Sequence, residues 1–194
     1  MPRTATQTLY LTFDDGPHPV VTAFVLDLLK KHNAKGTFFC IGKNVAAYPD
    51  IYQRILAEGH SVGNHTHNHV NGWKTSVNDY LQNVQLARKY INSPLFRPPY
   101  GRLTSKQAKQ LTMNNRQLST TAKSDIVMWS ILSGDFDTRI SGEKCWQNIY
   151  KNATDGDIIV FHDSEKAAER LYNALPKTVA YFSAKGFTFS GLPL

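Results

Sequence analysis

The sequence has few cysteines and no long apolar run, and each shortage excludes a class of protein. Two cysteines, Cys40 and Cys145, are too few for a disulfide scaffold and lack metal-site spacing, so we expect two buried thiols. The apolar runs reach only a few residues, whereas a membrane-spanning helix needs about 20, so we expect no transmembrane segment. A chain of 194 residues with 41% hydrophobic residues has the composition of one globular domain.

Acidic residues are also in deficit, and the basic residues that outnumber them are scattered. Lys and Arg number 22 against 15 Asp and Glu, giving a net charge of +7. This balance favours anionic surroundings such as nucleic acid, anionic lipid or an acidic cell-wall polymer. No basic run is longer than Lys30–Lys31, whereas a nucleic-acid-binding face would be clustered, so we expect no nucleic-acid partner.

The segment before the first expected strand has no apolar core of the kind that a signal peptide needs. We therefore expect no signal peptide in this sequence. If a signal peptide was removed, a cell-envelope, periplasmic or secreted location is expected.

Short runs of β-forming residues alternate with segments of helical periodicity. Strands are expected at 8–13, 36–41, 60–63, 95–97, 126–129, 157–161 and 187–189. Helices are expected at 19–32, 48–56, 77–91, 104–113, 142–152 and 165–184. This alternation argues for a parallel sheet or a (β/α) barrel in a single domain, 1–194. The polar stretch Asn114–Ser124 is expected to be a mobile loop.

Reactive side chains follow the ends of most expected strands. Loops at the carboxyl ends of parallel strands share one face of such a fold, so these side chains should converge. Each has a plainer explanation alone: Asp-Asp-Gly-Pro can be a turn, and His-Asp can cap a helix. The residues concerned are Asp14, Asp15, His65, His67, His69, Arg97, Tyr100, Asp135, Asp137, His162 and Asp163.

The three alternating histidines suggest a metal site, because imidazole is a common zinc ligand. His65 and His69 lie four residues apart, which places both on one side of a helical turn. In an extended chain His67 would share their face as well. Spacing alone does not choose between these pairings.

Five motifs occur in order along the chain: TFDDGP (12–17), NHTHNH (64–69), RPPYG (97–101), Trp129…Asp135-Phe136 and IVFHDS (159–164). With these motifs the sequence resembles, from residue 8 to about 190, the polysaccharide deacetylase family, also called the NodB homology domain or carbohydrate esterase family four. That resemblance implies a distorted (β/α) barrel of about seven strands, with 1–194 as the catalytic domain. It also implies hydrolysis of N-acetyl, or alternatively O-acetyl, groups on sugar polymers or oligomers, with peptidoglycan, chitin oligomers and acetylated xylan all open as substrates.

The resemblance assigns one half of the chemistry to two of these motifs and an arginine. Asp14 would be the general base, and Arg97 would hold it in position. Asp15, His65 and His69 would bind one divalent ion, with zinc expected and cobalt or nickel as alternatives. A divalent ion is suited to this reaction because an amide carbonyl is a poor electrophile.

The other half of the chemistry would come from the later motifs. His162 would be the general acid, oriented and tuned by Asp135. The backbone N–H of Tyr100 would face the oxyanion. Tyr100, Phe136 and Val160 would contact the substrate around the acetyl group. The expected partner is an N-acetylated saccharide, and the chain is expected to be a monomer.

Three positions depart from the family pattern and leave the preferred sugar open. The fourth motif usually ends in Asp-Trp and here reads Asp135-Phe136, and Leu132 stands where an acidic residue is usual. His67 occupies a position that is often aromatic, so we expect it near the mouth of the site without ligating the metal.

A serine hydrolase is the second reading. Gly59–Gly63 matches G-x-S-x-G, and Asp135 and His162 follow in the right order after Ser61. The context argues against it, because this motif should follow a strand and here it follows a helix.

A third reading is a non-catalytic carbohydrate-binding protein on a deacetylase scaffold. Four aromatic residues would stack on sugars: Tyr10, Trp73, Tyr100 and Trp146. This reading requires a broken catalytic site, whereas the key residues are all present: Asp14, Asp15, His65, His69 and His162.

Overall fold

A computed structural model describes residues 7–113 and 123–193, and its centre is a parallel sheet. The strands follow the order β5-β4-β3-β2-β1-β7-β6, and β8 pairs with the start of β1. Every strand pairing in the described residues is parallel. The strands are β1 (Thr8–Asp14), β2 (Gly36–Cys40), β3 (Ser61–Asn64), β4 (Leu95–Phe96), β5 (Asp125–Ile126), β6 (Ile131–Leu132), β7 (Ile158–His162) and β8 (Thr188–Phe189).

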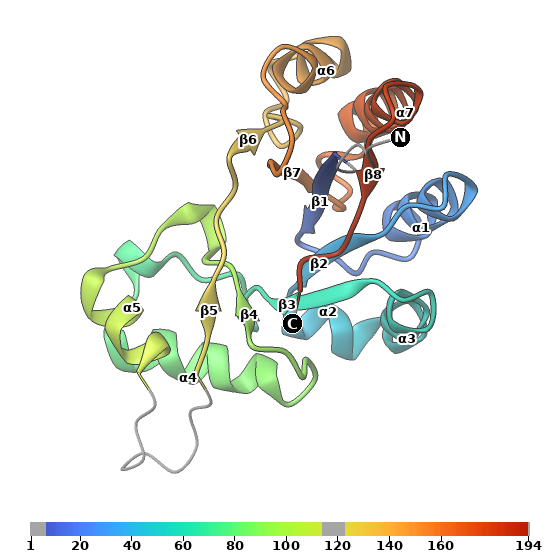
Figure 1. Ribbon diagram of the computed structural model, residues 1–194. Coiled ribbons are helices and arrows are strands. Elements are labelled where there is room, and N and C mark those ends of the chain that lie inside the picture. The colour runs from blue at the N-terminus through green and yellow to red at the C-terminus, as the bar shows by residue number, and fades with distance from the viewer. Residues whose placement is uncertain (1–6, 114–122, 194) are drawn as a thin grey trace, which may run out of the picture.

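Helices surround the strands on the outside (Figure 1). Among the described residues no helix is both long enough and apolar enough to span a bilayer. Two short 3₁₀ turns, η1 (Gly72–Lys74) and η2 (Pro99–Gly101), lie in the loops. The helices are α1 (Val21–Lys31), α2 (Gly42–Ala47), α3 (Pro49–Ala57), α4 (Val77–Arg88), α5 (Ser105–Thr112), α6 (Gly142–Tyr150) and α7 (Ala168–Ala184).

The two end strands of the sheet are neighbours in the chain, and this makes the sheet curl. Only residues 127–130 join β5 to β6, and the steps from Ile126 to Ile131 span at most about 18 Å when fully extended. The sheet must therefore bend round until its ends approach each other, which makes it the incomplete, distorted barrel that the sequence predicts.

Alternation along β1 separates the core from the site. Leu9, Leu11 and Phe13 are fully buried and belong to the main apolar cluster that packs under the helices. The intervening Thr12 and Asp14 point to the opposite face, the concave interior of the sheet. The register then aligns Asp14 with His162 on the neighbouring strand β7. The polar ends of distant strands are therefore brought together.

The helices and most strands agree with the sequence prediction to within a few residues, but the region around residue 128 differs. The expected strand 126–129 is reduced to β5, and a second short strand, β6, follows it. The side chain of Arg97 donates to the carbonyl oxygens of Val127 (3.1 Å) and Met128 (3.4 Å), which occupies acceptors that a strand would use. The short helix α2 was not predicted. Most of the loop expected at 114–124 falls on residues 114–122, which lie outside the described part of the chain.

Candidate active site

A buried ion pair forms one wall of the site. Arg97 follows β4 and Asp14 ends β1, and the guanidinium Nη1 lies 2.8 Å from Asp14 Oδ1. Both side chains are buried, with Arg97 0% and Asp14 2% exposed. Arg97 Nη1 also donates to Thr12 Oγ1 (2.7 Å), and its guanidinium lies 4.1 Å from the centre of the Phe39 ring. The sequence prediction that Arg97 positions Asp14 therefore has the geometry it requires.

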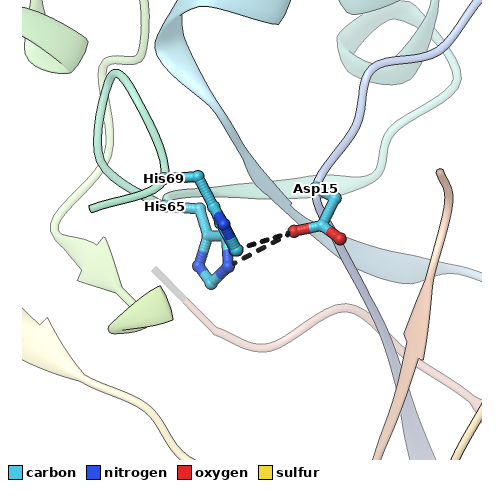
Figure 2. A group of neighbouring side chains, drawn as sticks. All are labelled: Asp15, His65 and His69. Atoms are coloured by element: carbon cyan, nitrogen blue, oxygen red, sulfur yellow. Dashed lines mark ion pairs between the residues drawn. The ribbon is translucent and has the colours of Figure 1, made fainter. Parts of the chain in front are cut away.

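Next to Asp14 in the chain, Asp15 converges with His65 and His69 (Figure 2). Asp15 Oδ1 lies 3.1 Å from Nε2 of His69 and 3.7 Å from Nε2 of His65. One ligand atom from each of the three lies within 4.8 Å of the other two. Asp15 Oδ1 is buried and has no hydrogen-bond partner within the described chain. A carboxylate oxygen and two imidazole nitrogens facing one point form a donor set that suits a zinc-type ion.

The local electrostatics also suit a cation. Burial alone would raise the pKa of Asp15, but the imidazoles of His69 and His65 lower it by a larger amount. The pKa of Asp15 therefore lies well below the usual range for aspartate. Burial lowers the pKa of His65 and so favours the neutral imidazole that a metal ion needs. His65 Nδ1 donates to the carbonyl of Arg97 (2.8 Å), which leaves the Nε2 lone pair facing Asp15.

The loops that carry these ligands hold a strained backbone. Of the five described non-glycine residues with positive φ, three lie in these loops, Asp15, Thr66 and His69, and a fourth, Tyr100, lies in the loop after β4. Such conformations cost about 1–3 kcal/mol each and persist only where surrounding contacts impose them. The buried Asn64 supplies one of these contacts, because its Oδ1 accepts from the Thr66 amide at 2.8 Å. The histidine loop is therefore held in a shape that aims His65 and His69 inward.

A second buried carboxylate orients His162 across the cavity. Asp135 Oδ1 lies 2.7 Å from His162 Nδ1, and its Oδ2 accepts from the His162 amide at 2.7 Å. Ser133 Oγ donates to the same Oδ1 at 3.0 Å. Burial disfavours the charged form of His162, but the charge and hydrogen bond of Asp135 outweigh it and raise the pKa of His162 to about 9. This imidazole can therefore carry a proton on Nε2 near neutral pH.

A cavity of about 750 Å³ joins these groups. Tyr100 lines it, with its ring centroid 4.6 Å from that of His69, and Phe136 packs edge-on to His162 at 5.3 Å. Val160, in contrast, is fully buried and does not line the cavity. Val160 lies two residues before His162 on β7, so its side chain is on the same face of the sheet but farther from the cavity. Leu132, which pairs with Val160 on the neighbouring strand β6, lines the cavity instead.

His67 lies away from the cavity, contrary to our expectation. Its ring stacks on Tyr90 at 5.7 Å, and its amide donates to Asn83 Oδ1 of α4 (2.9 Å). The backbone turns over between the two ligand histidines, so the middle one packs against α4. Asp137 also lies outside the cavity lining and pairs with Arg139 at 2.8 Å.

The serine-hydrolase reading is wrong in its geometry. Ser61 begins β3 rather than following a strand, and its Oγ donates to the carbonyl of Leu192 at 2.7 Å. It does not line the cavity that holds His162. Of the aromatic residues considered for sugar stacking, Trp73 and Tyr100 line the cavity, whereas Trp146 packs on Tyr181.

Asp163 is a buried carboxylate to which the sequence reasoning assigned no role beyond a helix cap. Its Oδ1 accepts from the Gly16 amide (2.9 Å) and its Oδ2 from Thr22 Oγ1 (2.5 Å). A Cβ at Gly16 would lie 2.1 Å from Asp163 Oδ2, so only glycine allows this close approach. Burial raises the pKa of Asp163 to about 7. Its position next to His162 was the only signal, because its partners lie more than a hundred residues away in the sequence.

Comparison with known proteins agrees with this geometry. Residues 2–119 match the family model for polysaccharide deacetylase. The chain is 35% identical over 190 residues to a peptidoglycan-N-acetylglucosamine deacetylase of Bacillus cereus, which covers 94% of this chain and 66% of the relative. It is 31% identical over 207 residues to a chitooligosaccharide deacetylase of Azorhizobium caulinodans, covering 96% and 93%.

A solved structure has the same architecture. The peptidoglycan deacetylase PdaC from Bacillus subtilis superposes with a TM-score of 0.82 at 28% identity, covering 96% of this chain and 88% of that one. The chain spans only 66% of the length of the Bacillus cereus relative, so part of that protein has no counterpart here.

Proposed function

Because the chain belongs to the polysaccharide deacetylase family, we propose that it hydrolyses N-acetyl groups on sugar polymers or oligomers with the help of one divalent ion. One observation carries this proposal. A three-ligand set, a carboxylate held by a buried arginine and a histidine held by a buried carboxylate all face one cavity. The reaction adds water across the amide bond and yields acetate and the free amine of the sugar.

The ligand set is Asp15, His65 and His69. A divalent ion held there would polarise the acetamide carbonyl and make water a better nucleophile at neutral pH. Zinc suits the two imidazoles and one carboxylate best, and cobalt or nickel would be accepted by the same donors. Asp15 Oδ1 is buried and faces the Nε2 atoms of His69 and His65 without accepting a hydrogen bond in the described chain, so a bound cation would satisfy this oxygen.

Asp14 is the general base of the proposal. Its Oδ1 accepts from Arg97, which leaves Oδ2 to take a proton from the attacking water. The buried guanidinium fixes the position of the carboxylate. The backbone N–H of Tyr100 is proposed to stabilise the oxyanion that forms on the acetyl oxygen.

His162 is the general acid. Its Nδ1 is held by Asp135, so the proton on Nε2 is the one available to the departing sugar nitrogen. Amines leave poorly as anions, and this protonation lets the carbon–nitrogen bond break. The pKa of about 9 keeps His162 protonated at neutral pH.

The substrate class proposed is an N-acetylglucosamine-containing glycan of the bacterial envelope or a chitin-like oligomer, because relatives carrying both names match this chain. The alternative reaction is O-deacetylation, for example of acetylated xylan. An envelope glycan lies outside the cytoplasm, so we propose a cell-envelope or secreted location. Every residue assigned comes from one chain, so a monomer suffices.

Acetate release tests the proposal. Purified protein is assayed on a peptidoglycan glycan, a chitooligosaccharide and acetylated xylan, first untreated, then after chelation, then with zinc, cobalt or nickel restored. We expect acetate from at least one N-acetylated substrate, loss after chelation and recovery with the ion. Glycan binding without acetate release under any of these conditions would instead indicate a carbohydrate-binding protein.

A further inference from the structure

The rim of the cavity is strongly basic. Among the residues that line it, Lys74, Arg102 and Lys166 are cationic, and the only acids are Asp14 and Asp15, at the reacting centre. In the described chain none of these three cations has a carboxylate within 4.0 Å. Two of these cations flank the ring of Trp73: Arg102 lies over its face, and Lys74 is the next residue in the chain.

Arg102 is held in place before any ligand arrives. Its guanidinium lies 3.9 Å from the centre of the indole of Trp73, which is 62% exposed. The Trp73 indole N–H reaches the carbonyl of Leu103 at 3.4 Å. Stacking on an aromatic face orders the guanidinium while leaving its N–H groups free to bind a planar anion. Lys74 follows Trp73 directly in η1.

The rim is also joined to the body of the protein. A Cβ at Gly72 would lie 2.4 Å from the carbonyl oxygen of Arg102, so η1 packs tightly on the backbone after η2. The buried side chain of Gln107 donates to the carbonyls of Gly72 (2.9 Å) and Thr75 (3.1 Å). The stacked pair thus stands on a supported turn rather than on a free loop.

We propose that Arg102, with Lys74 lining the same cavity, is a carboxylate-binding subsite, and that the chain prefers acetylated glycans that carry carboxylates. This inference rests on the proposed function, since it concerns the substrate of the same cavity. Leu132 lines the cavity where the family pattern usually has an acid, so nothing there repels an anion. The guanidinium of Arg102 can bind a carboxylate through two parallel hydrogen bonds. A neutral chitin oligomer offers Arg102 and Lys74 only hydroxyl groups and apolar ring faces.

Two sources could supply the carboxylate in a peptidoglycan glycan: the lactyl ether on the sugar itself, or an acidic residue of an attached peptide. Four substrates of equal glycan length separate them. The first has free lactyl carboxylates, the second has these converted to amides, the third carries the peptide, and the fourth is the neutral chitotetraose.

The test compares wild type with Arg102→Gln and with Lys185→Gln. Lys185 is the matched control because it is also a cation over an aromatic ring, that of Tyr181 at 5.6 Å, but lies outside the cavity lining. At low ionic strength we expect the kcat/KM of wild type to be about tenfold higher for a carboxylate glycan than for its amide, and we expect this difference to come from KM. A factor of ten corresponds to about 1.4 kcal/mol of binding free energy. Arg102→Gln should reduce this preference to about twofold and weaken its salt dependence, while Lys185→Gln keeps both.

Several outcomes overturn the subsite. Equal losses on the carboxylate and amide substrates in Arg102→Gln would make the stacked pair a platform for neutral sugars. A wild-type enzyme indifferent to the carboxylate would also contradict it. Preference for the lactyl form or for the peptide-bearing form identifies the source of the anion.

A binding arm keeps the subsite separate from the proposed reaction. The same four glycans are titrated into Asp14→Asn protein with and without Arg102→Gln. If no substrate releases acetate in wild type, the proposed function fails, yet tighter binding of carboxylate glycans that depends on Arg102 would still support the subsite. Equal dissociation constants for acid and amide would refute it in either case.

Discussion

Each side of the cavity holds a buried carboxylate paired with a nitrogen-containing side chain, an arginine on one side and a histidine on the other. The two pairs differ in whether the nitrogen-containing side chain can gain and lose a proton. On the β1 side, Asp14 is paired with Arg97, whose guanidinium stays charged at any pH in the working range. On the β7 side, Asp135 is paired with His162, whose pKa of about 9 lies within reach of ordinary conditions. The first pair is permanent and the second can exchange a proton.

That difference matches two tasks in one hydrolysis. The base has to be held in place beside the proposed metal ligands, and Arg97 does this through its ion pair with Asp14. An acid must give up its proton and regain it, so its partner has to be an imidazole rather than a guanidinium. Substitutions on the β1 side should therefore remove metal, fold or rate outright, whereas those on the β7 side should act through pH.

The largest expected effect is on the ligand set of the β1 side. His65→Ala and His69→Ala should each lose the divalent ion and bring acetate release to background, because two ligands rarely retain a zinc-type ion. His67→Ala is the matched control: it should keep the ion, because that ring stacks on Tyr90. Elemental analysis of the three proteins checks this. Ion loss in His67→Ala alone would mean that the wrong histidines were assigned.

Breaking the permanent pair should cost stability. Arg97→Met leaves Asp14 buried without its partner, and we expect a loss of about 3–5 kcal/mol in the free energy of unfolding. The double variant Asp14→Asn/Arg97→Met should recover part of that loss, since no unpaired charge remains. Denaturant unfolding of the single and double variants gives the coupling. Strictly additive losses would show that the two side chains do not act as a pair.

Breaking the titratable pair should move a pH limb. His162 must be protonated to act, and its raised pKa keeps it so until about pH 9, so activity should fall as the pH rises through that value. Asp135→Asn removes the anion that holds the proton. The alkaline limb should then move to lower pH and the maximal rate should fall by about 10²-fold, with the ion content unchanged. If the alkaline limb of the pH–rate profile stays in place in Asp135→Asn, a group other than His162 sets that limb.

The smallest effect is expected at Asp163, which supports both sides. Asp163→Ala leaves the Gly16 amide without its acceptor, next to the ligand Asp15. We expect metal affinity to fall by about tenfold while the alkaline limb stays in place, since outer contacts typically affect affinity by 10–100-fold. Competition with a fluorescent chelator measures the affinity. Asp163→Asn, which keeps an acceptor, should restore most of it.

The chemistry of the site could be predicted from the sequence because it is concentrated in short motifs after buried strands. Asp14, Asp15, His65, His69 and His162 meet because parallel strands bring their carboxyl ends to one edge. The assignment of individual roles to them remains a prediction. His67 could not be placed, since its direction depends on the positive φ of Thr66, which no side-chain pattern reveals.

The rim of the cavity and the ends of the sheet lay beyond sequence reasoning. Trp73 and Arg102 meet only because Gly72 allows two 3₁₀ turns to pack together, and neither turn has a periodic pattern. The expected strand 126–129 is shortened where Arg97 donates to the carbonyls of Val127 and Met128. These features arise from contacts between residues that are distant in sequence.

The central claim is that two adjacent carboxylates have separate roles, Asp14 as the base and Asp15 as a metal ligand. Comparing Asp14→Asn with Asp15→Asn tests this claim most directly. Both proteins are loaded with zinc, checked for folding by circular dichroism, and measured for bound ion and acetate release. Asp14→Asn should keep about one ion per chain and lose turnover by about 10³-fold, because a base is gone and no ligand is. Asp15→Asn should fail to hold the ion. Equal ion loss in both, or an Asp14→Asn protein that turns over like wild type, would contradict the account.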